Sequence, residues 1–177
     1  MTAQPSPAQR GFSVRQARTS DVRGIHALVE PLVQERILLG KELVVFFESV
    51  QEFSVAVDNT TGAVIGCGAL HVLWEDLGEV RTLAVQEPWR GAGVGHAIYV
   101  RLEQQARELG LRRLFCLTFE TEFFGRHGFT SIGEELLVDP EVYSELVRSP
   151  DEGVAEFLDL SRVKPNTLGN SRLLKEL

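Results

Sequence analysis

Residues 79–108 read EVRTLAVQEPWRGAGVGHAIYVRLEQQARE, and this stretch decides the fold. Residues 79–85 alternate as a β-strand, and a loop rich in glycine follows them. Apolar residues at positions 94, 98, 102, 106 and 109 then recur at the spacing of one helix face. Residues 113–118, RLFCLT, form a second apolar strand pattern. Strand, helix and strand in this order predict a βαβ unit whose two strands run parallel.

The residues on either side of this unit complete an expected α/β (α+β) fold, a mixed central sheet flanked by helices. Before the unit we expect strands at 12–14, 53–57 and 63–73, a helix that begins at Val22 and breaks or restarts at Pro31, and a second helix at 41–50. After the unit we expect helices at 121–127 and 139–148 and a last strand at 154–160.

Length and charge exclude several classes of protein. The chain has 177 residues, with 18 Lys+Arg against 25 Asp+Glu and a net charge of −7, which argues against nucleic acid or a membrane surface as a general partner. Residues 1–11 look like a disordered tail, and residues 12–177 are expected to form a single domain. No apolar run approaches 18 residues and no signal peptide precedes the domain, so we expect a cytoplasmic protein.

Two cysteines, Cys67 and Cys116, are too few for a disulfide framework or a four-cysteine zinc site. Both lie in apolar runs, which favours reduced thiols in the core. We therefore expect no bound metal.

The glycine loop, Arg90-Gly91-Ala92-Gly93-Val94-Gly95-His96, precedes the helix directly. Glycine permits close approach of the backbone to a ligand, and the first amides of a helix attract anions, so the loop suits a phosphate or pyrophosphate. It lacks the Lys-Ser/Thr of a P-loop, and His96 stands where a dinucleotide fingerprint needs its last glycine. A flexible hinge before the helix is the alternative.

The stretch as a whole resembles the acetyl-CoA signature of the GNAT superfamily of N-acetyltransferases. Arg90, Gly93 and Gly95 match its central pattern, and FFGRHGF at 123–129 is similar to its later motif. The resemblance implies a sheet that splays around an acetyl-CoA cleft, with acetyl-CoA as co-substrate. The implied contacts are pyrophosphate on the amides of 91–96, pantetheine on the backbone of Leu83 and Val85, and the oxyanion on the N–H of Leu83. The full implied cofactor set is Leu83, Ala84, Val85, Arg90, Gly91, Ala92, Gly93, Val94, Gly95, His96 and Phe123.

A finer resemblance is to the acetyltransferase domain of N-acetylglutamate synthases, the amino-acid N-acetyltransferases of arginine biosynthesis. It is carried by GCGAL at 66–70, GEV at 78–80, LAV at 83–85, LFCLT at 114–118, Asn166, Asn170 and Ser171. It implies a short, stand-alone form that acetylates the α-amine of L-glutamate or L-glutamine. A homodimer is an open expectation.

Candidate residues for the substrate follow from this resemblance. Lys41 and Arg81 would supply cations for the α-carboxylate, and His71 stands where glutamate-binding members often carry lysine. Thr82, Asn170 and Ser171 complete the expected substrate set. Since fewer fixed cations than usual surround the side-chain end, a neutral amide substrate stays open beside glutamate.

The expected chemistry is attack of a neutral amine on the thioester, for which Glu79 is the candidate base through water and Leu83 the oxyanion donor. Phe124 stands where the superfamily usually has its tyrosine acid, and Tyr99, Tyr143, Ser171 or solvent could take that role. Surface charge is the alternative for Lys41 and Arg81, and a plain strand-end carboxylate is the alternative for Glu79. A GNAT acting on another amine, or a non-catalytic acetyl-CoA or amino-acid sensor, are the competing functions.

Overall fold

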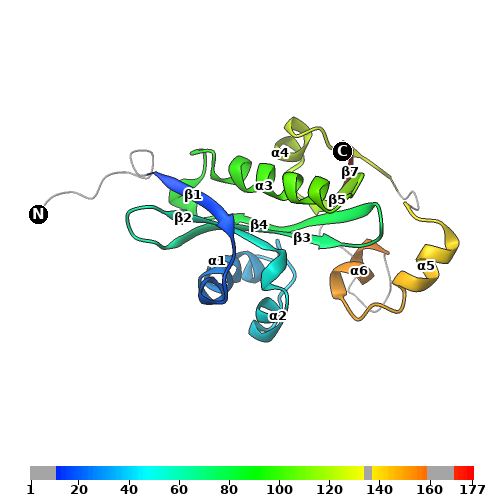
Figure 1. Ribbon diagram of the computed structural model, residues 1–177, viewed down its shortest axis with the longest axis horizontal. Coiled ribbons are helices and arrows are strands. Elements are labelled where there is room, and N and C mark those ends of the chain that lie inside the picture. Colours follow the sequence, from blue (N-terminus) through cyan, green and yellow to red (C-terminus); the bar gives the residue numbers. More distant parts are fainter. Residues whose placement is uncertain (1–10, 134–136, 159–169) are drawn as a thin grey trace, which may run out of the picture. The chain divides into compact units, whose positions relative to one another are not determined.

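The structure, a computed structural model, describes residues 11–133, 137–158 and 170–177 (Figure 1). The chain divides into two compact units. The first consists of residues up to His71 together with Val80–Glu108, and the second of Val72–Glu79 with Leu109–Leu177. The expected single domain over 12–177 stays a prediction, and apart from Gly11 the expected tail lies outside the described residues.

The first unit contains an antiparallel meander of strands. Its order is β1 (Phe12–Gln16), β2 (Phe53–Asp58), β3 (Val64–Val72) and then β4 (Leu77–Val85). Val14 of β1 pairs with Ala56, and Val55 of β2 pairs with Cys67. Every residue of β2 is buried, which explains its nearly continuous apolar sequence. The predicted hairpin of residues 53–73 is therefore confirmed.

Helices cover both faces of this meander, with α1 (Val22–Gln34) and α2 (Leu43–Glu48) on one face and α3 (Val94–Glu108) on the other (Figure 1). The core under α1 and α2 contains Ile25, Val29, Phe46, Phe53 and Val55. Three single 3-10 turns, η2 (Thr19–Asp21), η3 (Val50–Glu52) and η4 (Glu87–Trp89), link these elements.

The predicted break at Pro31 is wrong, because α1 continues through it to Gln34. Proline removes one helical hydrogen bond, but burial of Ile25 and Val29 fixes the helix through its packing. The helix ends soon afterwards, where the amide of Glu35 bonds to the carbonyl of Pro31 at 3.0 Å.

Two glycines of β3 set how closely α3 approaches the strands. A Cβ on Gly66 would lie 2.8 Å from Ile98 Cδ1 and 2.9 Å from Val94 Cγ1. A Cβ on Gly68 would lie 2.9 Å from Ile98 Cγ2 and 3.0 Å from Leu102 Cδ1. The Gly-Cys-Gly sequence thus places the beginning of α3 directly against the sheet.

The second unit continues from the first residues of β4. β5 (Arg113–Thr118) runs parallel to them, from Leu77↔Arg113 to Glu79↔Phe115, as the βαβ prediction required. β7 (Ser171–Glu176) pairs antiparallel with β5 and also with the short β6 (Thr130–Ser131). The sequence reading did not anticipate β6 or β7.

Three short helices belong to this unit, namely α4 (Thr121–Arg126), α5 (Pro140–Leu146) and α6 (Glu152–Phe157). The predicted strand at 154–160 is wrong over its described part, since α6 covers its beginning and residues 159 and 160 lie outside the described residues. Val154, Phe157 and Leu158 all enter the core, a spacing that fits one helix face. Asp151 caps this helix by accepting a bond from the Val154 amide at 3.0 Å.

Candidate functional site

The glycine loop lies between η4 and α3 and is anchored at its beginning by Trp89. This side chain is buried and meets Phe12 edge to face, with 6.2 Å between ring centroids. Gly91 and Gly93 have φ angles of +80° and +83°, and a Cβ at either position would meet nothing within 4 Å. These glycines are needed for backbone conformation and not for space. The loop therefore has a defined shape, which counts against a featureless hinge.

The start of α3 follows directly. The Ala97 amide bonds to the Gly93 carbonyl at 3.0 Å, and the first amides of a helix point toward its open end. Val94 and Ile98 are buried against Gly66, so this helix end is held firmly. The predicted residues Arg90 to His96 are brought together here, with Arg90 Nε 3.5 Å from the Val85 carbonyl oxygen. The arrangement suits an anion.

β4 is distorted at Thr82, whose φ is +57° inside a strand. A β-branched residue in the left-handed region is strained, and such strain gathers at functional sites. The Cys67 thiol donates a hydrogen bond to the Thr82 carbonyl oxygen at 3.5 Å. Leu83 follows this distortion, and Ala84 is buried in the core under α1 and α2. The sequence reading placed Thr82 in the site but gave no sign of this backbone conformation.

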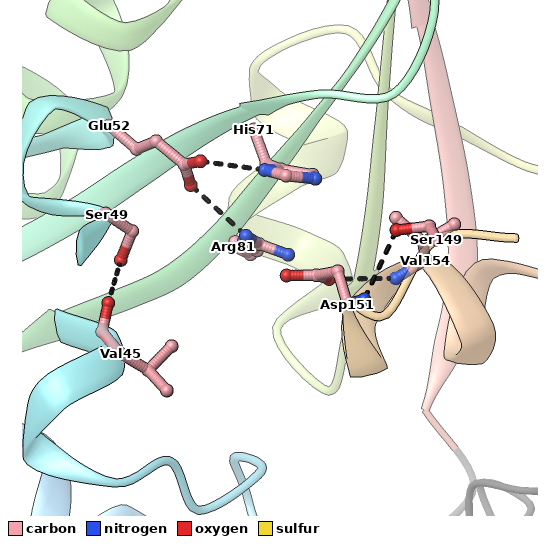
Figure 2. A network of polar contacts seen from close by, with 8 residues as sticks. All are labelled: Val45, Ser49, Glu52, His71, Arg81, Ser149, Asp151 and Val154. Atoms are coloured by element: carbon pink, nitrogen blue, oxygen red, sulfur yellow. Dashed lines mark hydrogen bonds and ion pairs between the residues drawn. The ribbon is translucent and has the colours of Figure 1, made fainter.

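A charged cluster joins two of the predicted substrate residues. Glu52, at the end of η3, has one carboxylate oxygen 2.9 Å from His71 Nδ1 and the other 3.1 Å from Arg81 Nη2 (Figure 2). Their side chains are 21%, 19% and 11% exposed. Burial raises the pKa of Glu52, but the hydrogen bonds and charges of His71 and Arg81 outweigh burial and hold that pKa below its usual value.

Glu52 is the residue that sequence reasoning missed. Its signal was weak, because an acidic residue just before a buried strand is usually a solvated turn residue. Lys41, predicted with Arg81 to supply a cation for the carboxylate, lies half-buried between α1 and α2.

Glu79 is buried at 5% exposure and lies opposite Phe115 in the β4–β5 pairing. Burial, and then the charge of Glu79, raises the pKa of Cys116. Burial likewise raises the pKa of Cys67 to about 12. Both cysteines are free, buried thiols, as predicted.

The remaining predicted residues lie in the second unit. Phe123 is half-buried on α4 and stacks near His127, with 4.6 Å between ring centroids. Phe124 packs edge to face on Phe129 and belongs to the core. Ser171 pairs with Thr118, and Asn170 precedes it. Asn166 lies outside the described residues.

Of the candidates for the proton donor, Tyr99 is almost fully buried on α3, and its hydroxyl donates to Glu103 at 2.6 Å. This bond gives Tyr99 a structural role. In the residues that the structure describes, no group of three or more His, Cys, Asp or Glu side chains gathers as a metal site would require. Over the same residues, no helix has the length and apolar character needed to span a bilayer.

Comparison with known proteins gives a family match. The model of the Acetyltransferase (GNAT) family matches residues 27–129. An amino-acid acetyltransferase of Mycobacterium tuberculosis is 61% identical over 162 residues, covering 91% of this chain and 92% of the relative. An amino-acid acetyltransferase of Pseudomonas putida is 36% identical over 126 residues, and the matched part is 29% of that longer relative.

Solved structures agree with these relatives. Rv2747 of Mycobacterium tuberculosis, solved in complex with CoA and NLQ, matches with a TM-score of 0.89 and 60% identity over 93% of this chain and 99% of its own. The N-acetylglutamate synthase of Neisseria gonorrhoeae, complexed with coenzyme A and N-acetyl-glutamate, matches with a TM-score of 0.73 and 27% identity. That match covers 94% of this chain and 35% of the synthase.

Proposed function

Because the chain belongs to the GNAT acetyltransferase family, we propose that it transfers acetyl from acetyl-CoA to the α-amine of an amino acid, L-glutamate or L-glutamine. The observation that carries the proposal is the conjunction of the shaped glycine loop with the His71–Glu52–Arg81 cluster in one unit. The relatives named amino-acid acetyltransferase support the same substrate class.

The glycine loop would hold the pyrophosphate of CoA. Its amides at the start of α3 supply hydrogen-bond donors and a favourable helix dipole, and Gly91 and Gly93 give the loop its turn. The β4–β5 pairing runs from Leu77↔Arg113 to Glu79↔Phe115. We expect the amides of pantetheine to bond to the backbone of Leu83 and Val85 beyond those pairs.

The proposed reaction breaks the thioester carbon–sulfur bond and forms an amide bond to the substrate nitrogen. Acetyl-CoA supplies an activated acyl group, so the protein need only bind, orient and move protons. Glu79 would accept a proton from the substrate ammonium through water, and the Leu83 N–H would donate to the developing oxyanion. The thiolate of CoA leaves and takes up a proton. Phe124 cannot donate and the hydroxyl of Tyr99 is bonded to Glu103, so Tyr143, Ser171 and solvent stay as the candidates for this donor.

The guanidinium charge of Arg81 and the ring of His71 would receive the carboxylate of the amino acid, with Lys41 in support. Glu52 already neutralises part of this charge. Less positive charge therefore remains for the side-chain carboxylate of glutamate, whereas the neutral amide of glutamine needs no countercharge. Glutamine accordingly stays beside glutamate in the proposal. We also propose a place at the start of arginine biosynthesis and, as a separate expectation, a location in the cytoplasm.

The experiment that tests this function identifies the product. Purified protein is incubated with acetyl-CoA carrying a ¹³C label in its acetyl group and an equimolar mixture of the twenty amino acids. Mass spectrometry should find the label on the α-nitrogen of glutamate or glutamine. Label on another amine alone would overturn the substrate class, while tight acetyl-CoA binding without any labelled product would favour a sensor.

A further inference from the structure

We infer that Glu52 is a positioning residue of the amino-acid site, which holds Arg81 and His71 in the orientation that receives the carboxylate of the substrate. The inference rests on the proposed function. Glu52 lies in η3, outside the two strands that carry Arg81 and His71, and no motif of the sequence marks it.

Both carboxylate oxygens of Glu52 are used, one for each partner. Oε1 lies 2.9 Å from Nδ1 of His71 on β3, and Oε2 lies 3.1 Å from Nη2 of Arg81 on β4. Figure 2 shows the contacts that run from the two oxygens of this carboxylate to His71 and to Arg81, with the second ring nitrogen of His71 directed away from it. One residue thus fixes side chains that come from two neighbouring strands.

The charge on Glu52 also selects the form of His71. An ionised carboxylate only accepts hydrogen bonds, so Nδ1 of His71 carries a proton and donates it to Oε1. The ring orientation is fixed in the same way that a carboxylate orients a histidine beside a metal or a nucleophile.

The backbone around Glu52 is held without help from its carboxylate. Gln16 Nε2 donates to the carbonyl oxygens of Gln51 and Phe53 at 2.6 and 2.9 Å. The Glu52 amide bonds to the Ser49 carbonyl at 2.9 Å, and the Ser49 hydroxyl donates to the Val45 carbonyl at 2.7 Å (Figure 2). Loss of the carboxylate should therefore disorient two side chains and leave the fold in place.

The carboxylate of Asp21 differs from that of Glu52 in its hydrogen-bond partners. Asp21, which accepts bonds from Arg15, also accepts one from the backbone amide of Arg18 and so ties a turn. In the part of the chain that the structure describes, both bonds to the Glu52 carboxylate come from side chains. Arg81 and His71 keep 11% and 19% exposure, which leaves them accessible to a small solute.

The test uses Glu52→Gln, Glu52→Asp and a matched control, Glu48→Gln, whose side chain is exposed at the end of α2. Glutamine has an NH₂ group in place of one carboxylate oxygen. This group would face the N–H of His71 or of Arg81, and that side chain would lose its hydrogen bond. We expect Glu52→Gln to raise the KM for the amino acid about tenfold, with the KM for acetyl-CoA unchanged and kcat within about twofold. Glu52→Asp keeps the charge and should fall between wild type and Glu52→Gln, and Glu48→Gln should match wild type.

A second readout does not need turnover. In ¹⁵N spectra of the wild-type protein, Nδ1 of His71 should give the signal of a protonated nitrogen, and Glu52→Gln should change that signal while thermal melting stays close to wild type. If Glu52→Gln does not fold, Glu52→Asp carries both readouts.

The outcomes separate the two claims. An unchanged amino-acid KM in Glu52→Gln, with active wild-type protein, overturns the positioning role and leaves the proposed function standing. If Glu52→Gln raises the KM for the amino acid and the KM for acetyl-CoA equally and lowers the melting temperature, Glu52 has a structural role. That outcome also overturns the positioning role. A wild-type protein that acetylates no amino acid overturns the proposed function and this inference with it.

Discussion

The Cys67 thiol on β3 donates a hydrogen bond to the Thr82 carbonyl on β4 at 3.5 Å, and Thr82 has a φ of +57°. A buried thiol therefore supports the one place where β4 leaves ordinary strand conformation within the described residues. Leu83, whose N–H is the proposed oxyanion donor, comes next in the chain. The unusual backbone conformation at Thr82 therefore lies directly before the amide that we propose as the oxyanion donor.

At position 82, glycine should be more stable than alanine, which reverses the usual order in strands. A left-handed φ costs an L-residue about 1–2 kcal/mol and costs glycine nothing, whereas glycine elsewhere is less stable than alanine by ~0.5–1 kcal/mol. Urea denaturation of Thr82→Gly and Thr82→Ala measures the difference. Thr118 on β5, which lacks a positive φ, is the control, and alanine should be better there. The same order at both positions would contradict a strained Thr82.

Gly68→Ala should lower the free energy of unfolding by about 1–3 kcal/mol, because its Cβ would lie 2.9 Å from Ile98 Cγ2. The displaced helix should also weaken CoA binding, since the glycine loop leads directly into it. Gly125→Ala on α4, where nothing lies within 4 Å of the new Cβ, is the matched control and should be neutral or stabilising. Chemical denaturation and calorimetric titration with CoA check both effects. Equal stability of the two variants would remove the packing argument.

Gly93→Ala should weaken CoA binding about tenfold and lower the free energy of unfolding by about 1–2 kcal/mol, because its φ of +83° is disfavoured for alanine and the loop must strain or change shape. Calorimetric titration with CoA measures the affinity. Retention of wild-type affinity would mean that the loop is only a hinge.

Asp21→Asn should destabilise the protein by about 2 kcal/mol at neutral pH. The bidentate bond from Arg15, at 2.6 and 2.9 Å, lowers the pKa of Asp21, although burial opposes the effect. A carboxyl with a lowered pKa stabilises the fold fully above its ordinary pKa of about 4, and that contribution is lost as pH falls through the folded-state pKa. The stability difference between wild type and Asp21→Asn should therefore shrink in acid. Glu122→Gln, an exposed change on α4, is the control and should leave stability at neutral pH close to wild type.

Much of the first unit was predictable from sequence because its signals are local. The helical spacing of apolar residues from Val94 to Ala106 predicted α3, and the glycines at 91 and 93 predicted the loop before it. The parallel pairing of β4 with β5 followed from the order of elements alone.

The elements and residues that the sequence did not predict depend on contacts between residues distant in sequence. β7 depends on the pairing of residues 171–176 with β5. The helix α6 buries the same apolar residues that a strand would bury. Glu52 gains its role from His71 and Arg81, which lie 19 and 29 residues away. No periodicity reveals such a cluster, and the prediction of His71 and Arg81 as substrate residues lacked the group that connects them.

The most direct test of the central claim is the rate of CoA release from acetyl-CoA with L-glutamate and with L-glutamine, measured side by side with purified protein. The proposed function predicts turnover with at least one of the two that is far above the rate of acetyl-CoA hydrolysis without an amine. Release at the hydrolysis rate with both amino acids would contradict it.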